Sequence, residues 1–295
     1  MNLSLSRSFP IAKAALAAVV IACAVVLTCS LAGCASGGTD SISAGTDSTS
    51  ASTDSKTLRV AMELAYPPFE TKDDAGNPEG LAVDFIRDFG KAYGYDVQIE
   101  NTAWDGLIPS LQSDKADLVI SSMTITDERK QSVDFSDAYA MAQLAILANA
   151  DSGVASIDDL NQPGKKVAVK TGSTGDVYAT KNLANAEIVR LADESACVTE
   201  VVQGKADGFL YDQLTIYRNH QANPDTTEAV FIPFQDAEEW GIAVKKGNTE
   251  LLDQLNAFIA QSKADGEFDR LTEKYLADEK KAFDQYGFKW FFDFE

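Results

Sequence analysis

The chain has 295 residues and carries 45 acidic against 25 basic side chains, which gives a formal net charge of −20 at pH 7. Such a surface disfavours nucleic acid and anionic lipid head groups as partners, and it favours solubility. After the N-terminal segments, about 240 residues remain, which is more than one small domain needs and sufficient for two lobes.

Residues 1–33 contain the three parts of a secretory signal: a basic start, an apolar run and small residues at the cut. The letters LAGC at residues 31–34 resemble the lipobox of bacterial lipoproteins, in which the cysteine receives lipid and becomes the mature N-terminus. Cys34 is therefore the predicted lipidation site. The alternative is an uncleaved anchor, because residues 14–33 are about long enough to span a bilayer. Either outcome places the rest of the chain at the outer face of the cell membrane, on a tether.

Residues 34–56 are rich in Ser, Thr, Gly and Asp, and they hold one large apolar residue, Ile42. With so little to bury, this linker is predicted to be disordered. Two of the four cysteines would leave with the signal and Cys34 would carry lipid, so only Cys197 remains in the folded part. It lies on an apolar helical face, where we expect it to be buried, and no intramolecular disulfide is possible.

Strand and helix patterns alternate from residue 57 onward. In chain order the first half reads as a strand at 58–64, a helix at 81–93 closed by Gly94, a strand at 95–100, a helix at 106–113 capped by Asp105, and a buried strand at 117–121. The alternation restarts at residue 165, and two helices at 249–263 and 267–276 finish the body. Strict alternation predicts an α/β fold with parallel-rich sheets and helices on both faces.

Two such runs predict two lobes, and the stretches 138–150 and 230–246 between them are predicted to be hinge strands. We therefore expect a first lobe at 57–145 plus 234–279, a second lobe at 146–233, and a C-terminal tail at 280–295. Ligands of open α/β sheets bind outside the carboxyl ends of strands, and four stretches of this chain fall at such ends.

Two of these stretches offer aromatic faces. In AYPPFE, proline restricts the preceding residue to extended geometry, which fixes Tyr66 at a strand exit, where its ring can form a pocket floor. The alternative is that Tyr66 and Phe69 are core residues under a turn. In TAWDGLIP, the loop residue Trp104 can face Tyr66 and sandwich an aliphatic or planar group. Core packing is again the alternative.

The third stretch, SSMTITDER, holds a basic residue at an unfavourable place. Arg129 falls in the first turn of a predicted helix, where a cation costs roughly 0.3–1 kcal/mol against the helix dipole. A guanidinium grips a carboxylate with two parallel hydrogen bonds, and hydroxyls and backbone groups lie beside it at Ser121, Ser122 and Thr124. These residues predict a carboxylate clamp. The alternative is an ion pair of Arg129 with Asp127 or Asp134.

The fourth stretch combines VAVKTGSTGDVYA with GKADGFLYD downstream. Glycine and small hydroxyl residues ahead of a helix leave backbone N–H groups free to cradle an anion. No GK[ST] follows, so a nucleotide is not expected. Asp212 offers an acceptor for an ammonium group, and its alternative role is that of a helix cap.

Together these stretches supply a carboxylate clamp, an ammonium acceptor and two aromatic faces, which a zwitterionic amino acid requires. Over about residues 57–277, the chain resembles the polar amino-acid-binding branch of the bacterial extracellular solute-binding proteins, family 3, which serve ABC importers. The motifs that carry the resemblance are AYPPFE, GLAVDFIRDFGKAYG, WDGLIPSLQSDKADLVISSMTITDERKQSVDFSDAY, KVAVKTGSTGDVYA, GKADGFLYD and GIAVKKGN. It implies the type II periplasmic-binding-protein-like fold, in which two α/β lobes are joined by two hinge strands and close on an L-amino acid.

The resemblance also implies roles for individual residues. Arg129 would hold the α-carboxylate of the ligand with Thr124 and the backbone N–H of Thr174. Asp212, the Ser122 carbonyl and Thr124 would take the α-ammonium group. The other implied ligand-binding positions are Ser121, the flanking aromatics Tyr66 and Trp104, and the substrate-sorting positions Glu63, Lys170 and Tyr211.

Two of the sorting positions bear on the identity of the amino acid. Glu63 alone would favour arginine or lysine, but Lys170 matches the position at which glutamine-binding relatives carry a lysine. An acid beside a base suits a neutral group that has both a donor and an acceptor, so a polar uncharged residue such as glutamine is favoured. A cationic amino acid or cystine is the alternative. In either case the implied partner is an ABC transporter permease, and we expect a monomer.

The tail departs from the resemblance, since residues 280–295 have no recognisable counterpart and carry seven aromatics in the last 13 residues. Packing onto a lobe is predicted, and docking on a permease or a second copy is the alternative. A further departure is the first-lobe disulfide of some members, which this chain cannot form.

An enzyme is the alternative from another functional class, because the same fold houses dehydratases that act on small acids. The only histidine is His220, so histidine triads and HExxH metal sites are excluded. We expect no metal and no cofactor. Carboxylate catalysis by Glu63 or Asp212 stays open, but the prediction is a binding protein rather than an enzyme.

Overall fold

The computed structural model describes residues 56–286 and 289–294, all of which belong to one structural unit. The predicted signal peptide, Cys34 and most of the predicted linker lie outside the described residues. Strand β1 (Lys56–Met62) begins at the last residue of that linker, so the prediction of disorder is wrong for Lys56, which pairs with Tyr95. Within the described ranges, no helix is both long and apolar enough to cross a bilayer.

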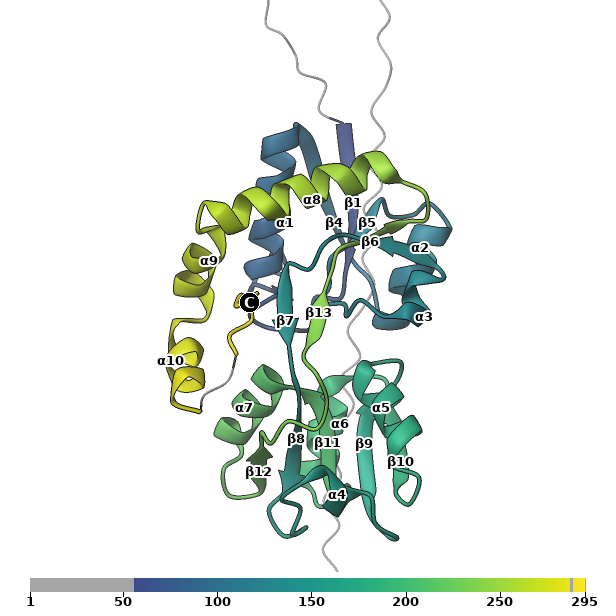
Figure 1. The fold of residues 1–295 in the computed structure, drawn as a ribbon, viewed down its shortest axis with the longest axis vertical. Coiled ribbons are helices and arrows are strands. Elements are labelled where there is room, and N and C mark those ends of the chain that lie inside the picture. Colours follow the sequence, from purple (N-terminus) through teal and green to yellow (C-terminus); the bar gives the residue numbers. More distant parts are fainter. Residues whose placement is uncertain (1–55, 287–288, 295) are drawn as a thin grey trace, which may run out of the picture. The chain divides into compact units, whose positions relative to one another are not determined.

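The first lobe is built on a five-stranded sheet with the order β4-β1-β5-β14-β6 (Figure 1). Its other strands are β4 (Tyr95–Asn101), β5 (Leu118–Val119), β14 (Ala243–Lys245) and β6 (Val133–Phe135). Strand β1 runs parallel to β4 and β5, whereas β14 is antiparallel to its neighbours. The lobe also contains a small hairpin, β2 (Thr71–Lys72) and β3 (Pro78–Glu79), and the helical elements α1 (Leu81–Tyr93), η1 (Trp104–Gly106), α2 (Leu107–Gln112), α3 (Asp127–Lys130), α8 (Thr249–Ala264) and α9 (Glu267–Tyr275).

The second lobe has a sheet with the order β10-β9-β11-β8-β12. Its strands are β8 (Leu144–Asn149), β9 (Lys166–Lys170), β10 (Glu187–Leu191), β11 (Gly208–Asp212) and β12 (Thr227–Val230), and its helices are α4 (Ile157–Leu160), α5 (Thr174–Asn182), α6 (Glu194–Val202) and α7 (Gln213–Ala222). Strand β9 is parallel to β10 and β11, and β8 is antiparallel to β11 and β12.

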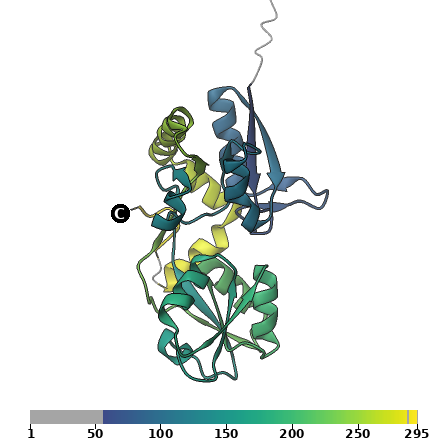
Figure 2. The ribbon, with the colours of Figure 1, turned by 90° about the vertical axis from the view of Figure 1, so that its right-hand side faces the viewer.

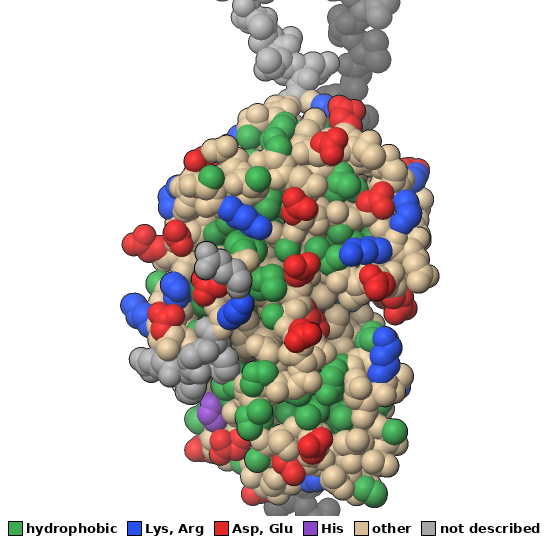
Figure 3. All heavy atoms as spheres, viewed as in Figure 1, with side chains coloured by type: hydrophobic (Ala, Val, Ile, Leu, Met, Phe, Trp, Pro, Cys, Tyr) green, Lys and Arg blue, Asp and Glu red, His purple; other side chains and the backbone are tan. Residues whose placement is uncertain are grey.

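Two antiparallel strands, β7 (Ala140–Ala142) and β13 (Glu238–Trp240), connect the lobes (Figures 1 and 2). The fold is therefore the predicted one, with two α/β lobes joined by two hinge strands. Acidic side chains are spread over both lobes on the face shown in Figure 3, as the net charge leads one to expect.

Helix α1 illustrates how sequence spacing sets local structure. Leu81, Phe85, Ile86 and Phe89 are all buried, because they recur at positions i, i+4, i+5 and i+8, which lie on one helical face. Gly94 ends the helix with a φ of 75°, a left-handed conformation that glycine adopts without a Cβ penalty. Both features confirm the prediction for this helix.

The prediction of a helix cap at Asp105 is wrong. Asp105 lies inside the 3-10 turn η1, which begins after Ala103, and neither η1 nor α2 has a side-chain cap at its start. The extra turn moves the aspartate past the capping position.

The prediction that the tail packs back onto a lobe is confirmed. Helix α10 (Ala277–Tyr286) follows α9, and Trp290 and Phe291 are buried in the core of the first lobe. The Trp290 indole Nε1 donates a hydrogen bond of 3.2 Å to Thr272 Oγ1 on α9. In the second lobe Cys197 is buried, also as predicted.

Candidate functional site

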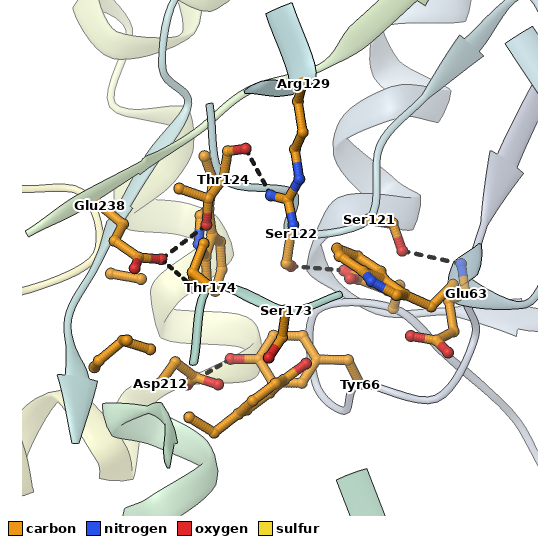
Figure 4. Close-up of a pocket in the computed structure, with 16 residues that line it drawn as sticks. Glu63, Tyr66, Ser121, Ser122, Thr124, Arg129, Ser173, Thr174, Asp212 and Glu238 are labelled. Carbon is orange, nitrogen blue, oxygen red and sulfur yellow. Dashed lines mark hydrogen bonds between the residues drawn. The ribbon is translucent and has the colours of Figure 1, made fainter. Parts of the chain in front are cut away.

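The candidate site is a pocket between the lobes, at the carboxyl ends of β1, β9 and β11 (Figure 4). Its walls come from the first lobe (Glu63, Tyr66, Glu70, Trp104, Ser121, Ser122, Thr124, Arg129), the second lobe (Leu144, Ser173, Thr174, Tyr211, Asp212) and the strands that connect them (Ala142, Glu238, Trp240). Every predicted ligand-binding residue lines this pocket except Lys170, which lies behind the wall.

Arg129 reaches the pocket from α3, where the Thr126 side chain caps the helix by accepting a hydrogen bond from the Arg129 backbone N–H. The guanidinium donates to the Thr124 carbonyl at 2.7 Å and, across the cleft, to the Gly172 carbonyl at 3.1 Å. No ion pair of Arg129 exists among the described residues, so the alternative of an Asp127 or Asp134 partner is wrong. Burial lowers the pKa of Arg129, because the desolvated charge lacks a paired anion.

Trp104 lies beneath the two basic groups of the site. Its ring centroid is 5.2 Å from the Arg129 guanidinium and 5.2 Å from the Lys170 ammonium, distances typical of cation–π contacts. Tyr66 is instead stacked on Phe69, with ring centroids 5.4 Å apart. Tyr66 is thus both a core residue and a pocket wall, so the two interpretations of AYPPFE both hold.

Tyr66 and Asp212 join the lobes. The Tyr66 hydroxyl donates to Asp212 Oδ1 at 2.7 Å, and the same oxygen caps α7 by accepting from the backbone N–H groups of Leu214 and Thr215. Asp212 is therefore a helix cap that also faces the pocket. Burial raises the pKa of Asp212 in spite of these hydrogen bonds.

Lys170 and Glu63 form a second contact across the cleft. The Lys170 ammonium, at the end of β9, donates to Glu63 Oε2, and the two side chains are only 5% and 14% exposed. Glu63 is held in turn by its backbone N–H, which donates to Ser121 Oγ at 2.9 Å. The positive charge of Lys170 is thus already matched by Glu63.

Two carboxyls of the pocket were not among the predicted site residues. Glu70 is 1% exposed and accepts a hydrogen bond of 3.1 Å from Ser122 Oγ. Burial raises its pKa well above the usual range. A signal for Glu70 was present in the sequence, since it is the last residue of AYPPFE. It lies in the same loop as Glu63, which was predicted to bind the ligand.

Glu238 is the second missed carboxyl. Its Oε2 accepts from Thr124 Oγ1 of the first lobe at 2.9 Å and from Thr174 Oγ1 of the second lobe at 2.8 Å, and its Oε1 accepts from Gln235 Nε2 at 2.7 Å. Burial raises the pKa of Glu238, and the nearby charge of Arg129 opposes the shift. The site therefore contains four lining carboxyls, one lining guanidinium, and Lys170 behind one of the carboxyls.

The family model of the bacterial extracellular solute-binding proteins, family 3, matches residues 58–278. A protein described as a probable histidine-binding protein of Neisseria gonorrhoeae is 34% identical over 87% of this chain and 95% of its own length. The L-cystine-binding protein TcyJ of Escherichia coli (strain K12) is 33% identical over 75% of this chain and 82% of its own length.

Solved structures agree with these sequence matches. An ancestral arginine-binding protein, solved once bound to arginine and once bound to glutamine, is 37% identical with a TM-score of 0.69, over 75% of this chain and 98% of that chain. The ancestral amino acid-binding protein AncCDT-1, described as a precursor of cyclohexadienyl dehydratase, is 38% identical with a TM-score of 0.68, over 74% of this chain and 94% of that chain.

Proposed function

We propose that this chain, which belongs to the bacterial extracellular solute-binding proteins of family 3, captures a free L-amino acid between its lobes and delivers it to the permease of an ABC importer. One observation carries the proposal: Arg129 lines the pocket and its guanidinium donates only to carbonyls, with no carboxylate paired to it among the described residues. A carboxylate ligand supplies the missing anion with two charge-assisted hydrogen bonds.

The proposed pose uses both lobes. Arg129, Thr124 and the backbone N–H of Thr174 hold the α-carboxylate. The α-ammonium group is held by Asp212, the Ser122 carbonyl and the Thr124 hydroxyl. The first lobe captures the zwitterion and the second completes the site, so closure is favoured by contacts that exist only when the lobes meet.

For the ligand side chain, the charges favour a cationic amino acid such as arginine, lysine or histidine. Glu63, Glu70, Asp212 and Glu238 outnumber Arg129 and Lys170 around the cavity. Burial raises the pKa values of Glu70, Asp212 and Glu238, and for Glu70 the charges of Glu63 and Asp212 add to the shift. A ligand with two positive groups stabilises the ionised carboxylates. Ranking cationic amino acids above glutamine reverses the prediction from sequence, which favoured glutamine and did not include Glu70 and Glu238 in the site.

Glutamine remains the second candidate because of one contact. Glu63 lines the pocket and is an acceptor, and its partner Lys170, behind the wall, is a donor. A neutral amide that inserts between them bonds to both. The two structures of an ancestral arginine-binding protein, with arginine and with glutamine, support treating the two ligands as alternatives for one pocket.

A thermal-shift screen of the twenty amino acids tests the proposal. We expect arginine, lysine or histidine to raise the Tm most and glutamine next, because a ligand at about 100 times its Kd stabilises the folded state by about 2.7 kcal/mol. Retention of the stabilising amino acid without turnover excludes a dehydratase. If none of the twenty changes the Tm, the proposed function is wrong.

The location follows from the N-terminal motif. We propose that Cys34 carries the lipid that anchors the protein at the outer face of the cell membrane. Metabolic labelling with a fatty acid should mark the parent protein and not the Cys34→Ala variant. Equal labelling of both would contradict the anchor.

A further inference from the structure

The C-terminal segment is the one motif from the sequence that the proposed function does not use. We call α10 together with residues 289–294 the C-terminal strap. Almost all of it lies beyond residue 278, where the family match ends. In Figure 1 the strap leaves α9, passes beside α7 of the second lobe, and returns to the hinge strand β7. Hydrogen bonds join it to both lobes and to the connection between them.

The outer part of the strap holds an arginine of the second lobe. Glu279 Oε1 on α10 accepts from Arg218 Nε at 2.9 Å and from Nη2 at 2.5 Å. The third nitrogen of the same guanidinium, Nη1, donates at 2.9 Å to the carbonyl of Pro67 in the first lobe. Arg218 therefore bridges the strap and the AYPPFE loop, and Glu279 fixes the orientation of the Arg218 guanidinium.

The inner part of the strap supports the same loop from the other side. Phe291 is fully buried, and its ring centroid lies 5.1 Å from Phe69 and 5.4 Å from Trp240. Both of these rings contact Tyr66, at 5.4 Å and 5.9 Å. The Phe291 carbonyl also accepts a hydrogen bond of 2.6 Å from the Met141 backbone N–H on β7.

We propose that the C-terminal strap positions the Tyr66–Glu70 loop for ligand binding, with Phe291 and Glu279 as its two positioning residues. The strap touches that loop at the Pro67 carbonyl, through Arg218, and at the Phe69 ring, through Phe291. Tyr66 lies between these points, and its hydroxyl donates to Asp212. The inference rests on the proposed function, since it concerns the affinity of that pocket.

Phe292 provides a matched control within the strap. It stacks on Phe268 at 4.8 Å between ring centroids, and among the described residues it makes no ring contact with the pocket wall. Truncation of either phenylalanine removes packing from the first lobe. Only truncation of Phe291 removes support from Tyr66.

The test measures binding of L-arginine and of L-glutamine to the full chain by calorimetry, beside the Tm of each variant. Phe291→Ala should weaken binding by about tenfold, and Phe291→Leu by less, while Phe292→Ala stays within about twofold of the parent protein. Glu279→Gln should also weaken binding, whereas Asp278→Asn, at an exposed position of the same helix, should not. If Phe291→Ala does not fold, the Phe291→Leu and Glu279→Gln variants test the inference instead.

A double-mutant cycle separates positioning from stability. In a Tyr66→Phe background, Phe291→Leu should cost less affinity than in the parent protein, because the hydroxyl that it helps to place is gone. Equal losses from Phe291→Leu and Phe292→Ala, or no loss in Phe291→Leu and Glu279→Gln, would overturn the inference and leave the proposed function intact. A parent protein that binds none of the twenty amino acids would overturn both.

Discussion

Arg129 and Glu238 line the same pocket, but each forms its hydrogen bonds with neutral groups. The guanidinium donates to two carbonyls, and the carboxylate accepts from two threonines and a glutamine. The Thr124 hydroxyl and the start of α5 at Thr174 are also the groups assigned to the ligand in the proposed pose. Glu238 therefore occupies the Thr124 hydroxyl that the ligand would use, and its charge competes with an incoming α-carboxylate for this part of the pocket.

Glu238→Gln should bind L-glutamine, whose side chain is uncharged, more tightly than the parent protein does. The amide still accepts hydrogen bonds, and loss of the charge removes about 1 kcal/mol of repulsion toward the ligand carboxylate, which corresponds to about fivefold in Kd. Calorimetry at pH 7.5 checks the change. Glu239→Gln is the control, since Glu239 is the exposed neighbour on the same strand, and a tenfold weaker Kd for Glu238→Gln would contradict the competition.

Single residues also mark where sequence reasoning stops. Arg129 could be predicted, because a cation in the first turn of a helix needs a local reason. Glu238 could not, because two glutamates follow each other in the hinge strand and only the pairing with β7 decides which one faces inward. Lys170 was predicted at the site, but its pairing with Glu63 depends on how the lobes meet, which no local pattern encodes.

Helix α7 has its N-terminal cap at Asp212, and the same carboxylate faces the pocket. Asparagine caps a helix about as well as aspartate, whereas alanine costs about 0.5–2 kcal/mol. Asp212→Asn should thus keep the Tm within a few degrees of that of the parent protein while weakening ligand binding at least about tenfold, because the α-ammonium group loses its anion.

Thermal unfolding and calorimetry on the same samples make this comparison. Asp212→Ala should lose both stability and binding, which serves as the positive control for the cap. Binding by Asp212→Asn at the affinity of the parent protein would show that the aspartate only caps the helix.

Elements were predictable where their pattern was long and periodic. Helix α1 repeats buried residues over several turns, and its glycine stop is explicit. The start of α2 was not predictable, because the chain inserts the 3-10 turn η1 before it, and such a turn leaves no periodic signal. The aromatic residues of the strap predicted that it packs onto a lobe. Its support of the Tyr66–Glu70 loop could not be predicted, because it depends on tertiary contacts.

At the scale of the whole molecule, polar contacts cross between the lobes at several points. Among the described residues they include Arg129 to the Gly172 carbonyl, Tyr66 to Asp212, Lys170 to Glu63, and Arg218 to the Pro67 carbonyl. Glu238 on the hinge strand also bridges Thr124 and Thr174. Separation of the lobes breaks these contacts. A bound amino acid adds to them only what it binds more strongly in the closed arrangement than in the open one.

The central claim is that the Arg129 guanidinium receives the carboxylate of a free amino acid when the lobes close. A crystal structure grown with saturating L-arginine tests it most directly. We predict that the ligand carboxylate accepts two hydrogen bonds from Arg129 and that its ammonium group donates to Asp212. A pocket without ligand under those conditions, with Arg129 turned toward bulk water, would contradict the claim.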